Sequence, residues 1–248
     1  NTQKNRKENY TILYNVFLNK ILHFERITVS LQSQWQSKSM YKISINKDLL
    51  ADMPVVMHPG NIYVVDHMSQ VASAIRILRK CDIVGFDTET RPTFKKGHSH
   101  KVALLQLSTP DDSFLFRLNK IGMPVKLQEY IEDPERLKVG LSVHDDVNSL
   151  RRLVDIDPEG FVDVQILAKE KHIVDISLQK IYAILFGERI SKGQQLSNWE
   201  ADELSEAQKR YAAIDAWACI NIYKRLTSGE FIPEESPFFS IIEDEEDK

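Results

Sequence analysis

Residues Ile83–Thr90 read IVGFDTET and join an apolar run to two carboxylates. Ile83, Val84 and Phe86 are typical of a strand that is buried on both faces, as at the centre of a sheet. On such a strand Asp87 and Glu89 point to the same side, because side chains two residues apart share a face. Carboxylates this close repel each other unless a proton or a cation lies between them. The stretch predicts a central strand with a cation site at its end, although a strand end in water also explains so short a pattern.

The composition indicates a globular protein without a membrane span. The 248 residues are 42% hydrophobic and 27% charged, which is ordinary for soluble domains. No apolar run approaches the roughly 20 residues that cross a bilayer. Cys81 and Cys219 lack the spacing of metal ligands, so we expect reduced thiols in a cytoplasmic protein.

Charge is distributed unevenly along the chain. Residues 229–248 carry a net charge of −7, residues 1–39 carry +4, and residues 40–228 carry −1. We predict an N-terminal extension over 1–39, a folded domain over 40–228 and an acidic tail over 229–248. The extension could be flexible, could hold a short helix over 12–24, or could be translated sequence upstream of a start at Met40. Charge runs such as the tail are usually solvated and disordered, and the tail could also recruit a basic partner. A nearly neutral body gives no sign of nucleic-acid binding by bulk charge.

Apolar periodicity predicts an α/β fold. The expected strands cover residues 61–66, 81–87, 101–109, 113–118 and 136–142. The expected helices cover residues 69–80, 125–132, 145–154, 162–171, 177–187 and 205–226, with Ser69 and Ser205 as N-caps. This order favours a mixed five-stranded sheet flanked by helices, with a short extra strand or helix at the N-terminus.

A second pair of acids, Asp145 and Asp146, follows the strand in KVGLSVHDDVNSL, residues 138–150. An acid in the first turn of a helix often serves only as a cap or a dipole partner, which is sufficient for Asp145. Asp146 is the better candidate for a site. The apolar face that contains Val147 and Leu150 would dock its helix on the sheet near the end of the first acidic strand.

A last acid lies within the longest predicted helix, in YAAID, residues 211–215. Asp215 is surrounded by small and apolar residues, and Tyr211 lies one turn earlier on the same face. A buried carboxylate without a counter-ion is costly, so Asp215 either faces solvent at the edge of the helix or takes part in a site. Tyr211 is either a packing aromatic or a partner of that acid.

Together, the stretches FDTET, KVGLSVHDD and YAAIDAWA resemble the motifs of the DEDD superfamily of 3′–5′ exonucleases. The match is to its DEDDy branch, which belongs to the DnaQ-like group with an RNase H-like fold and includes ribonuclease D and the Werner exonuclease domain. The spacings of 57 residues from Glu89 to Asp146 and 69 from Asp146 to Asp215 suit this family. The resemblance covers roughly residues 60–228. It departs at ADEL, residues 201–204, where members commonly have an arginine and a proline before the leucine.

The resemblance implies a 3′–5′ exonuclease that uses two divalent ions, Mg²⁺ or Mn²⁺, to release nucleoside monophosphates from DNA or RNA. Asp87 would bridge both ions, Glu89 and Asp215 would complete the site that prepares the water nucleophile, and Asp146 would hold the second ion, directly or through water. Tyr211 would orient the water, since a phenol with a pKa near 10 is a poor base at neutral pH.

Substrate contacts are expected from two basic loops, at residues 91–101 and 187–199. The candidate residues are Thr88, Arg91, Phe94, Lys95, Lys96, Arg189 and Lys192. Cations could hold phosphates of a single strand or a 3′ end, and Phe94 could stack on a base. Solvated loops explain the same residues. A non-catalytic nucleic-acid-binding module and an interaction protein that acts through its acidic tail remain alternative functions.

Overall fold

The structure is a computed structural model that describes residues 41–93, 97 and 100–242. The chain divides into one unit of residues 42–240 and a second of residues 1–41 and 241–248. The predicted extension over 1–39 and residues 243–248 of the predicted tail lie outside the described residues, so the domain boundaries stay a prediction. Among the helices of the described residues, none combines the length and apolar character that a bilayer span requires.

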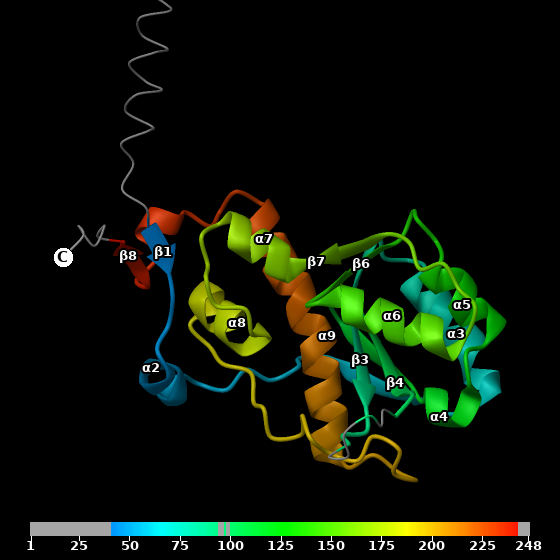
Figure 1. Ribbon diagram of the computed structural model, residues 1–248. Coiled ribbons are helices and arrows are strands. Elements are labelled where there is room, and N and C mark those ends of the chain that lie inside the picture. Colours follow the sequence, from blue (N-terminus) through cyan, green and yellow to red (C-terminus); the bar gives the residue numbers. More distant parts are fainter. Residues whose placement is uncertain (1–40, 94–96, 98–99, 243–248) are drawn as a thin grey trace, which may run out of the picture. The chain divides into compact units, whose positions relative to one another are not determined.

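The elements follow one another in the order shown in Figure 1. The strands are β1 Tyr41–Ile43, β2 Asn61–Val65, β3 Ile83–Thr90, β4 Val102–Ser108, β5 Asp112–Phe116, β6 Leu137–Gly140, β7 Phe161–Asp163 and β8 Phe239–Ile241. The α-helices are α2 Lys47–Asp52, α3 Met68–Leu78, α4 Leu118–Ile121, α5 Val125–Ile131, α6 Val143–Leu153, α7 Val164–Glu170, α8 Leu178–Phe186 and α9 Glu206–Thr227. A short 3-10 helix, η1, covers Pro233–Glu235.

The main sheet has the order β2-β5-β4-β3-β6-β7, and β1 and β8 form a separate two-stranded sheet. β3 pairs antiparallel with β4 and parallel with β6, so the acidic strand is central and the sheet is mixed, as predicted. The sheet has six strands rather than five. The additional strand, β7, has three residues, too few for an alternating pattern to separate it from the helix that follows it.

Helices cover both faces of the sheet. α3, α5 and α6 pack on one face around Phe86, Leu105 and Leu107. On the other face α8 lies against α9, which crosses β3 to β6 (Figure 1). β1 and α2 supply the predicted extra strand and helix at the N-terminal side.

The caps of two long helices differ in how well the sequence predicts them. Ser205 caps α9 as predicted, accepting a hydrogen bond from the Gln208 N–H, while the Gln208 side chain accepts from the Ser205 N–H. The prediction for α3 is wrong, because Ser69 lies inside the helix. Instead, the Gln70 side chain accepts from the N–H groups of Asp66 and His67 at the helix start.

The closest approach of α9 to the sheet occurs at Gly85. A Cβ atom at this position would lie 1.8 Å from the Ala216 carbonyl oxygen, so a glycine is required in β3. Ala216 and Ala212 are fully buried, and their small side chains let the helix pack closely on the sheet. Because Asp87 is two residues beyond Gly85 and Asp215 adjoins Ala216, this contact sets the distance between the two acids.

Replacing Gly85 by Ala should separate β3 from α9. The new methyl group would overlap backbone atoms that cannot move away cheaply, so the free energy of unfolding should fall by about 3 kcal/mol. Urea unfolding measures this change. Gly193→Ala is the control, because its nearest atom would be Ser191 Oγ at 3.6 Å and its effect should stay within about 0.5 kcal/mol. Equal stability of Gly85→Ala and the wild type would contradict the close contact.

Candidate metal and active site

Three carboxylates meet between β3 and α9. Asp87 and Glu89 point from β3 to the α9 face, and Asp215 points back from the middle of α9. One oxygen atom from each lies within 4.8 Å of the others. Asp215 is 7% exposed, which excludes the alternative that it faces solvent. A shift of register between Glu89 and Thr90 marks the point where the regular pairing of β3 with β4 ends.

Asp146 approaches the same place from α6. The chain turns between β6 and α6 at Ser142, which has a left-handed φ of 56° and donates its N–H to Asp163 Oδ1 over 3.1 Å. This turn puts Asp146 in the first turn of α6, where one carboxylate oxygen accepts a hydrogen bond from the Thr88 hydroxyl. Asp146 is therefore next to β3 but outside the three-carboxylate group, which we call the β3–α9 cluster.

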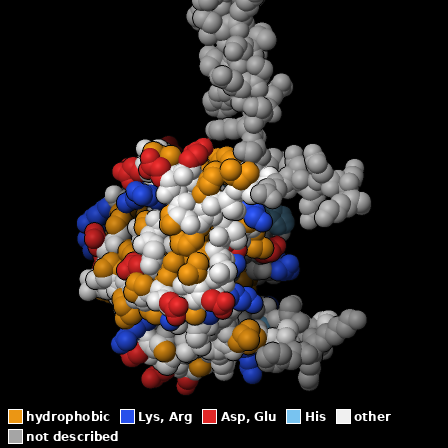
Figure 2. Space-filling view, turned by 90° about the vertical axis from the view of Figure 1, so that its left-hand side faces the viewer, with side chains coloured by type: hydrophobic (Ala, Val, Ile, Leu, Met, Phe, Trp, Pro, Cys, Tyr) orange, Lys and Arg blue, Asp and Glu red, His pale blue; other side chains and the backbone are white. Residues whose placement is uncertain are grey.

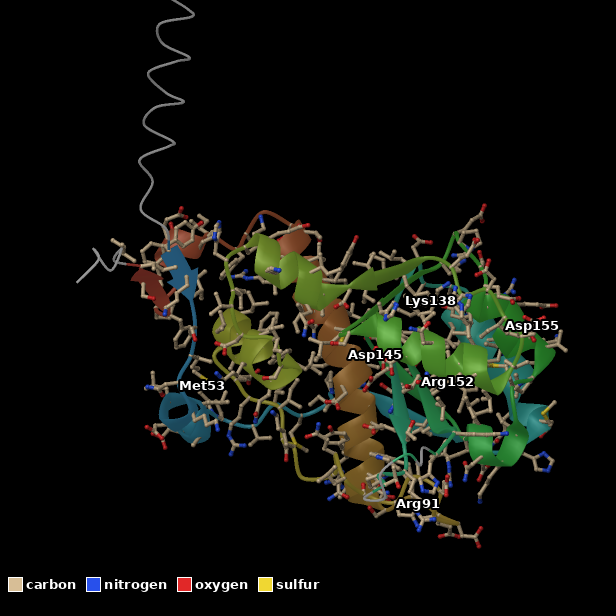
Figure 3. All side chains as sticks on the ribbon, viewed as in Figure 1. Met53, Arg91, Lys138, Asp145, Arg152 and Asp155 are labelled. Carbon is tan, nitrogen blue, oxygen red and sulfur yellow. The ribbon has the colours of Figure 1, made fainter. Side chains whose placement is uncertain are left out.

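Asp145 lies outside the site, at the start of α6 (Figure 3). Its side chain is 91% exposed, and its Oδ1 lies 3.6 Å from His144 Nδ1. The structure thus separates two adjacent acids that the sequence presents side by side. Asp145 serves below as a matched control for the buried carboxylates.

Burial and mutual repulsion shift the site acids toward their protonated forms when no cation is present. Burial raises the pKa of Asp87 well above its ordinary range, and the charges of Asp146, Asp215 and Glu89 add to the effect. Burial also raises the pKa of Glu89 to about 9, of Asp215 to about 7 and of Asp146 to about 6. Four carboxylates in this state form a site whose ionised form needs positive charge.

Tyr211 and Lys192 are the neighbours of Asp215. Tyr211 lies one turn earlier on α9, its hydroxyl donates to the Asp215 carboxylate, and its ring tilts against Trp199 with centroids 6.0 Å apart. Burial, together with the charges of Asp215 and Glu89, raises the pKa of the Tyr211 phenol, which stays protonated at neutral pH. The positive charge of Lys192 opposes the rise in the pKa of Asp215.

The β3–α9 cluster opens into a pocket of about 280 Å³, which we call the active-site pocket. Asp87, Thr88, Glu89, Tyr211 and Asp215 line one side of it. Lys192 lines the other side, together with Ser177 and Gln179 of the α8 start. Gln179 Nε2 donates to the Ile190 carbonyl over 2.6 Å, which fixes the loop that carries Lys192. The pocket therefore combines hard oxygen ligands with one facing cation.

The other residues predicted to bind substrate either do not line the active-site pocket or lie outside the described residues. Arg91 lies where β3 leaves the sheet and pairs with Glu200 over 3.3 Å, and His100 also reaches Glu200, over 3.1 Å (Figure 3). Arg189 donates through Nε to the Met53 carbonyl and does not line the active-site pocket. The three candidates Phe94, Lys95 and Lys96 lie outside the described residues. The roles of all these residues in binding stay predictions.

Two buried residues at the site, Cys219 and Gln106, are not predicted by any sequence motif. Cys219, one turn after Asp215, lines the active-site pocket and donates its thiol to the Asp215 carbonyl over 3.3 Å. Burial raises its pKa well above the ordinary value, so it stays a thiol. Gln106, opposite Asp87 in β4, is fully buried, and its amide has no hydrogen-bond partner among the residues described. The only signal for Gln106 is a polar residue inside the apolar run ALLQLS.

Comparison with known proteins matches both the sequence and the fold. The model of the 3′–5′ exonuclease family matches residues 62–229. The mouse bifunctional 3′–5′ exonuclease/ATP-dependent helicase WRN is 32% identical over 209 residues, which are 80% of this chain and 15% of that protein. The mut-7 exonuclease homologue of Aedes aegypti is 23% identical over 205 residues, 71% of this chain and 28% of that protein. The chain thus spans less than a third of either relative.

Solved structures share the fold. Escherichia coli RNase D, described as an exoribonuclease involved in structured RNA processing, superposes with a TM-score of 0.62 at 22% identity. The match covers 68% of this chain and 44% of that one. The mixed sheet with helices on both faces is therefore the RNase H-like fold that the motifs predict.

The protonated state of the site predicts how pH changes the stability of the metal-free protein. Carboxyl groups of an unfolded chain have pKa values near 4, whereas the pKa of Glu89 in the folded protein is about 9, so folding takes up protons between about pH 4 and pH 9. This proton uptake stabilises the folded protein fully below about pH 4, and the stabilisation is lost as the pH rises through the pKa values of the folded protein. In EDTA the melting temperature should fall as pH rises from about 5 to about 9. Adding Mn²⁺ should raise it, by more at higher pH.

Glu89→Gln should flatten this pH dependence, because an amide does not titrate. The matched control is Asp145→Asn, which removes an exposed acid. The charge of Asp145 contributes to the raised pKa of Asp146, so the slope of Asp145→Asn should change far less than that of Glu89→Gln. Differential scanning fluorimetry of the three proteins, with and without Mn²⁺, measures both effects. A slope that is the same in Glu89→Gln as in the wild type would contradict the electrostatic account.

Proposed function

The chain belongs to the DnaQ-like 3′–5′ exonuclease family, and on that premise we propose that it hydrolyses phosphodiester bonds at the 3′ end of nucleic acid with two divalent ions. The observation that carries the proposal is the β3–α9 cluster, in which three carboxylate oxygens lie within 4.8 Å of one another. A degenerate, purely binding member of the family would be free to lose these acids. Here Asp87, Glu89, Asp146 and Asp215, together with Tyr211 of the DEDDy motif, are all present.

The residues fit hard divalent cations. Carboxylate oxygens are the ligands that Mg²⁺ and Mn²⁺ prefer, and the raised pKa values of the four acids mark a site that lacks positive charge. Asp87, Glu89 and Asp215 would hold one ion. Asp146 lies outside the cluster, but its charge raises the pKa of Asp87, and it would help hold the second ion. When bound, such ions lower the pKa of water and neutralise charge on the phosphate.

The protein groups around the acids have separate tasks. Thr88 fixes the orientation of Asp146 through its hydroxyl hydrogen bond. The protonated Tyr211 hydroxyl, held by Asp215, is suited to orient a water molecule rather than to remove its proton. Lys192 faces the carboxylates across the pocket and can contact the phosphate that is cleaved. Thr88, Tyr211 and Lys192 would thus position a metal ligand, a water molecule and the phosphate. Such positioning is a large part of what a protein contributes to phosphoryl transfer.

The substrate class follows from the family, and we propose a single strand or a frayed 3′ end of DNA or RNA. The relatives include both a helicase-linked exonuclease and an exoribonuclease by name. A 5′-labelled oligonucleotide with a free 3′ hydroxyl should give a ladder of shortened products in Mn²⁺. The same oligonucleotide with a blocked 3′ end should stay intact. Matched DNA and RNA strands then identify the preferred sugar.

Asp87→Ala should abolish the ladder. Loss of the central carboxylate removes the charge on which the ions depend, so the rate should fall by about a thousandfold or more. The melting temperature in EDTA should stay the same or rise, because one repelling group is gone. Asp145→Asn is the control and should cleave at the wild-type rate. If the wild type binds the strand but never shortens it in Mn²⁺ or Mg²⁺, the protein is a binding module instead.

Tyr211→Phe tests the role of the hydroxyl. The variant keeps the ring against Trp199 and removes only the group that orients water, so kcat should fall by about a hundredfold with KM little changed. Single-turnover kinetics on the labelled oligonucleotide separate this effect from product release. An unchanged rate would assign Tyr211 to packing alone.

A further inference from the structure

The active-site pocket continues into a second pocket of about 360 Å³. The two pockets share three lining residues: Ser177, Gln179 and Lys192. The far wall of the second pocket comes from α2, through Lys47, Leu50 and Ala51. We call it the α2 pocket. A ligand that enters the active-site pocket past Lys192 can therefore extend along α2.

Main-chain hydrogen bonds fasten α2 to the loop that carries Lys192. The Arg189 N–H donates to the Pro54 carbonyl over 2.9 Å, and the Val56 N–H donates to the Arg189 carbonyl over 3.0 Å. Arg189 Nε adds a third bond to the carbonyl of Met53, the residue that ends α2 (Figure 3). Leu50 is buried in the core beneath α8 and α9. The wall of the α2 pocket is thus fixed before any ligand binds.

The lining of the α2 pocket is basic. Lys47, Lys180, Arg189 and Lys192 contribute four cations, and no carboxylate lines the pocket among the described residues. Lys180 forms a salt bridge with Asp175, whose side chain is 10% exposed, and the Nζ–Oδ1 distance is 2.5 Å. Its charge is therefore partly neutralised. Lys47 and Lys192 are exposed. Figure 2 shows basic, acidic and apolar side chains mixed over this side of the molecule, without a single large basic surface.

We infer that the α2 pocket binds a backbone phosphate of the nucleic-acid strand on the 5′ side of the bond that is cleaved. This inference rests on the proposed function. An enzyme that removes single nucleotides from a 3′ end leaves only one nucleotide beyond the scissile bond, and the active-site pocket takes that one. A phosphate bound outside the active-site pocket then belongs to the strand on the 5′ side. Cations that contact phosphates position the strand without reading its sequence.

Part of the α2 pocket lies outside the residues that the family model matches. α2 covers residues 47–52, and the family model matches residues 62–229. The four acids and Lys192 lie within the matched part, while Lys47 lies before it. Removing the charge of Lys47 therefore tests a contact that the catalytic motifs do not include.

The test compares Lys47→Glu with Lys126→Glu. Both lysines are exposed and lie in the first turn of a helix, where an acid is favourable for the helix dipole, but Lys126 is in α5 on the opposite face of the sheet. The first readout is fluorescence anisotropy of labelled oligodeoxythymidylate, about a dozen nucleotides long, in EDTA at several salt concentrations. Lys47→Glu should weaken binding by about tenfold and lower the salt slope by about one. Lys126→Glu should match the wild type.

The second readout separates the α2 pocket from the metal site. The p-nitrophenyl ester of thymidine 5′-phosphate carries one nucleotide, so it reaches only the active-site pocket. Lys47→Glu should hydrolyse this ester in Mn²⁺ at the wild-type rate while it shortens the oligonucleotide more slowly. The inference would be overturned if Lys47→Glu and Lys126→Glu bound the oligonucleotide equally well. It would also be overturned if Lys47→Glu lowered the rate of ester hydrolysis as much as the rate of oligonucleotide shortening. If the wild type hydrolyses neither substrate but the binding difference persists, the proposed exonuclease fails and the α2 pocket is a phosphate-binding site without a cleaved bond beside it, which overturns its assignment to the 5′ side.

Discussion

Repulsion among the clustered, largely desolvated carboxylates is the interaction on which the site depends. Asp87, Glu89 and Asp215 are held together by the backbone contact of Gly85 with Ala216, which brings α9 onto β3 without an intervening side chain. The cost appears as raised pKa values, because each acid is stable in this place only when it is protonated or neutralised by a cation. The fold thus holds together carboxylates that repel one another when ionised, and divalent ions can remove this repulsion.

The sequence predicts this centre well because its signals are local. The apolar run of β3, the Ser205 cap of α9 and the one-turn spacing of Tyr211 and Asp215 each follow from a few neighbouring residues, and the structure confirms these elements. Short elements such as β7 and α2 carry too few residues for a periodic pattern. The cap prediction for α3 is wrong because the helix begins at Met68, before Ser69, and the Gln70 side chain binds the N–H groups at its start.

Long-range contacts are the part that no local pattern contains. The sequence marks Thr88 as a possible substrate contact, but its hydroxyl binds Asp146, 58 residues away. Arg189 looks like a free cation in a polar loop, yet it fastens the segment that follows α2. Cys219 and Gln106 read as ordinary core residues, although one lines the pocket and the other lies opposite Asp87. Each depends on elements that meet only after folding.

We propose that the β3–α9 cluster is a divalent metal site, and anomalous scattering at the manganese edge can locate such an ion in crystals of the full chain grown with Mn²⁺. We expect a peak within bonding distance of carboxylate oxygens from Asp87, Glu89 and Asp215, and its loss in crystals of Asp87→Ala. A well-ordered map with no peak between these three side chains, or with manganese bound only elsewhere, would contradict it.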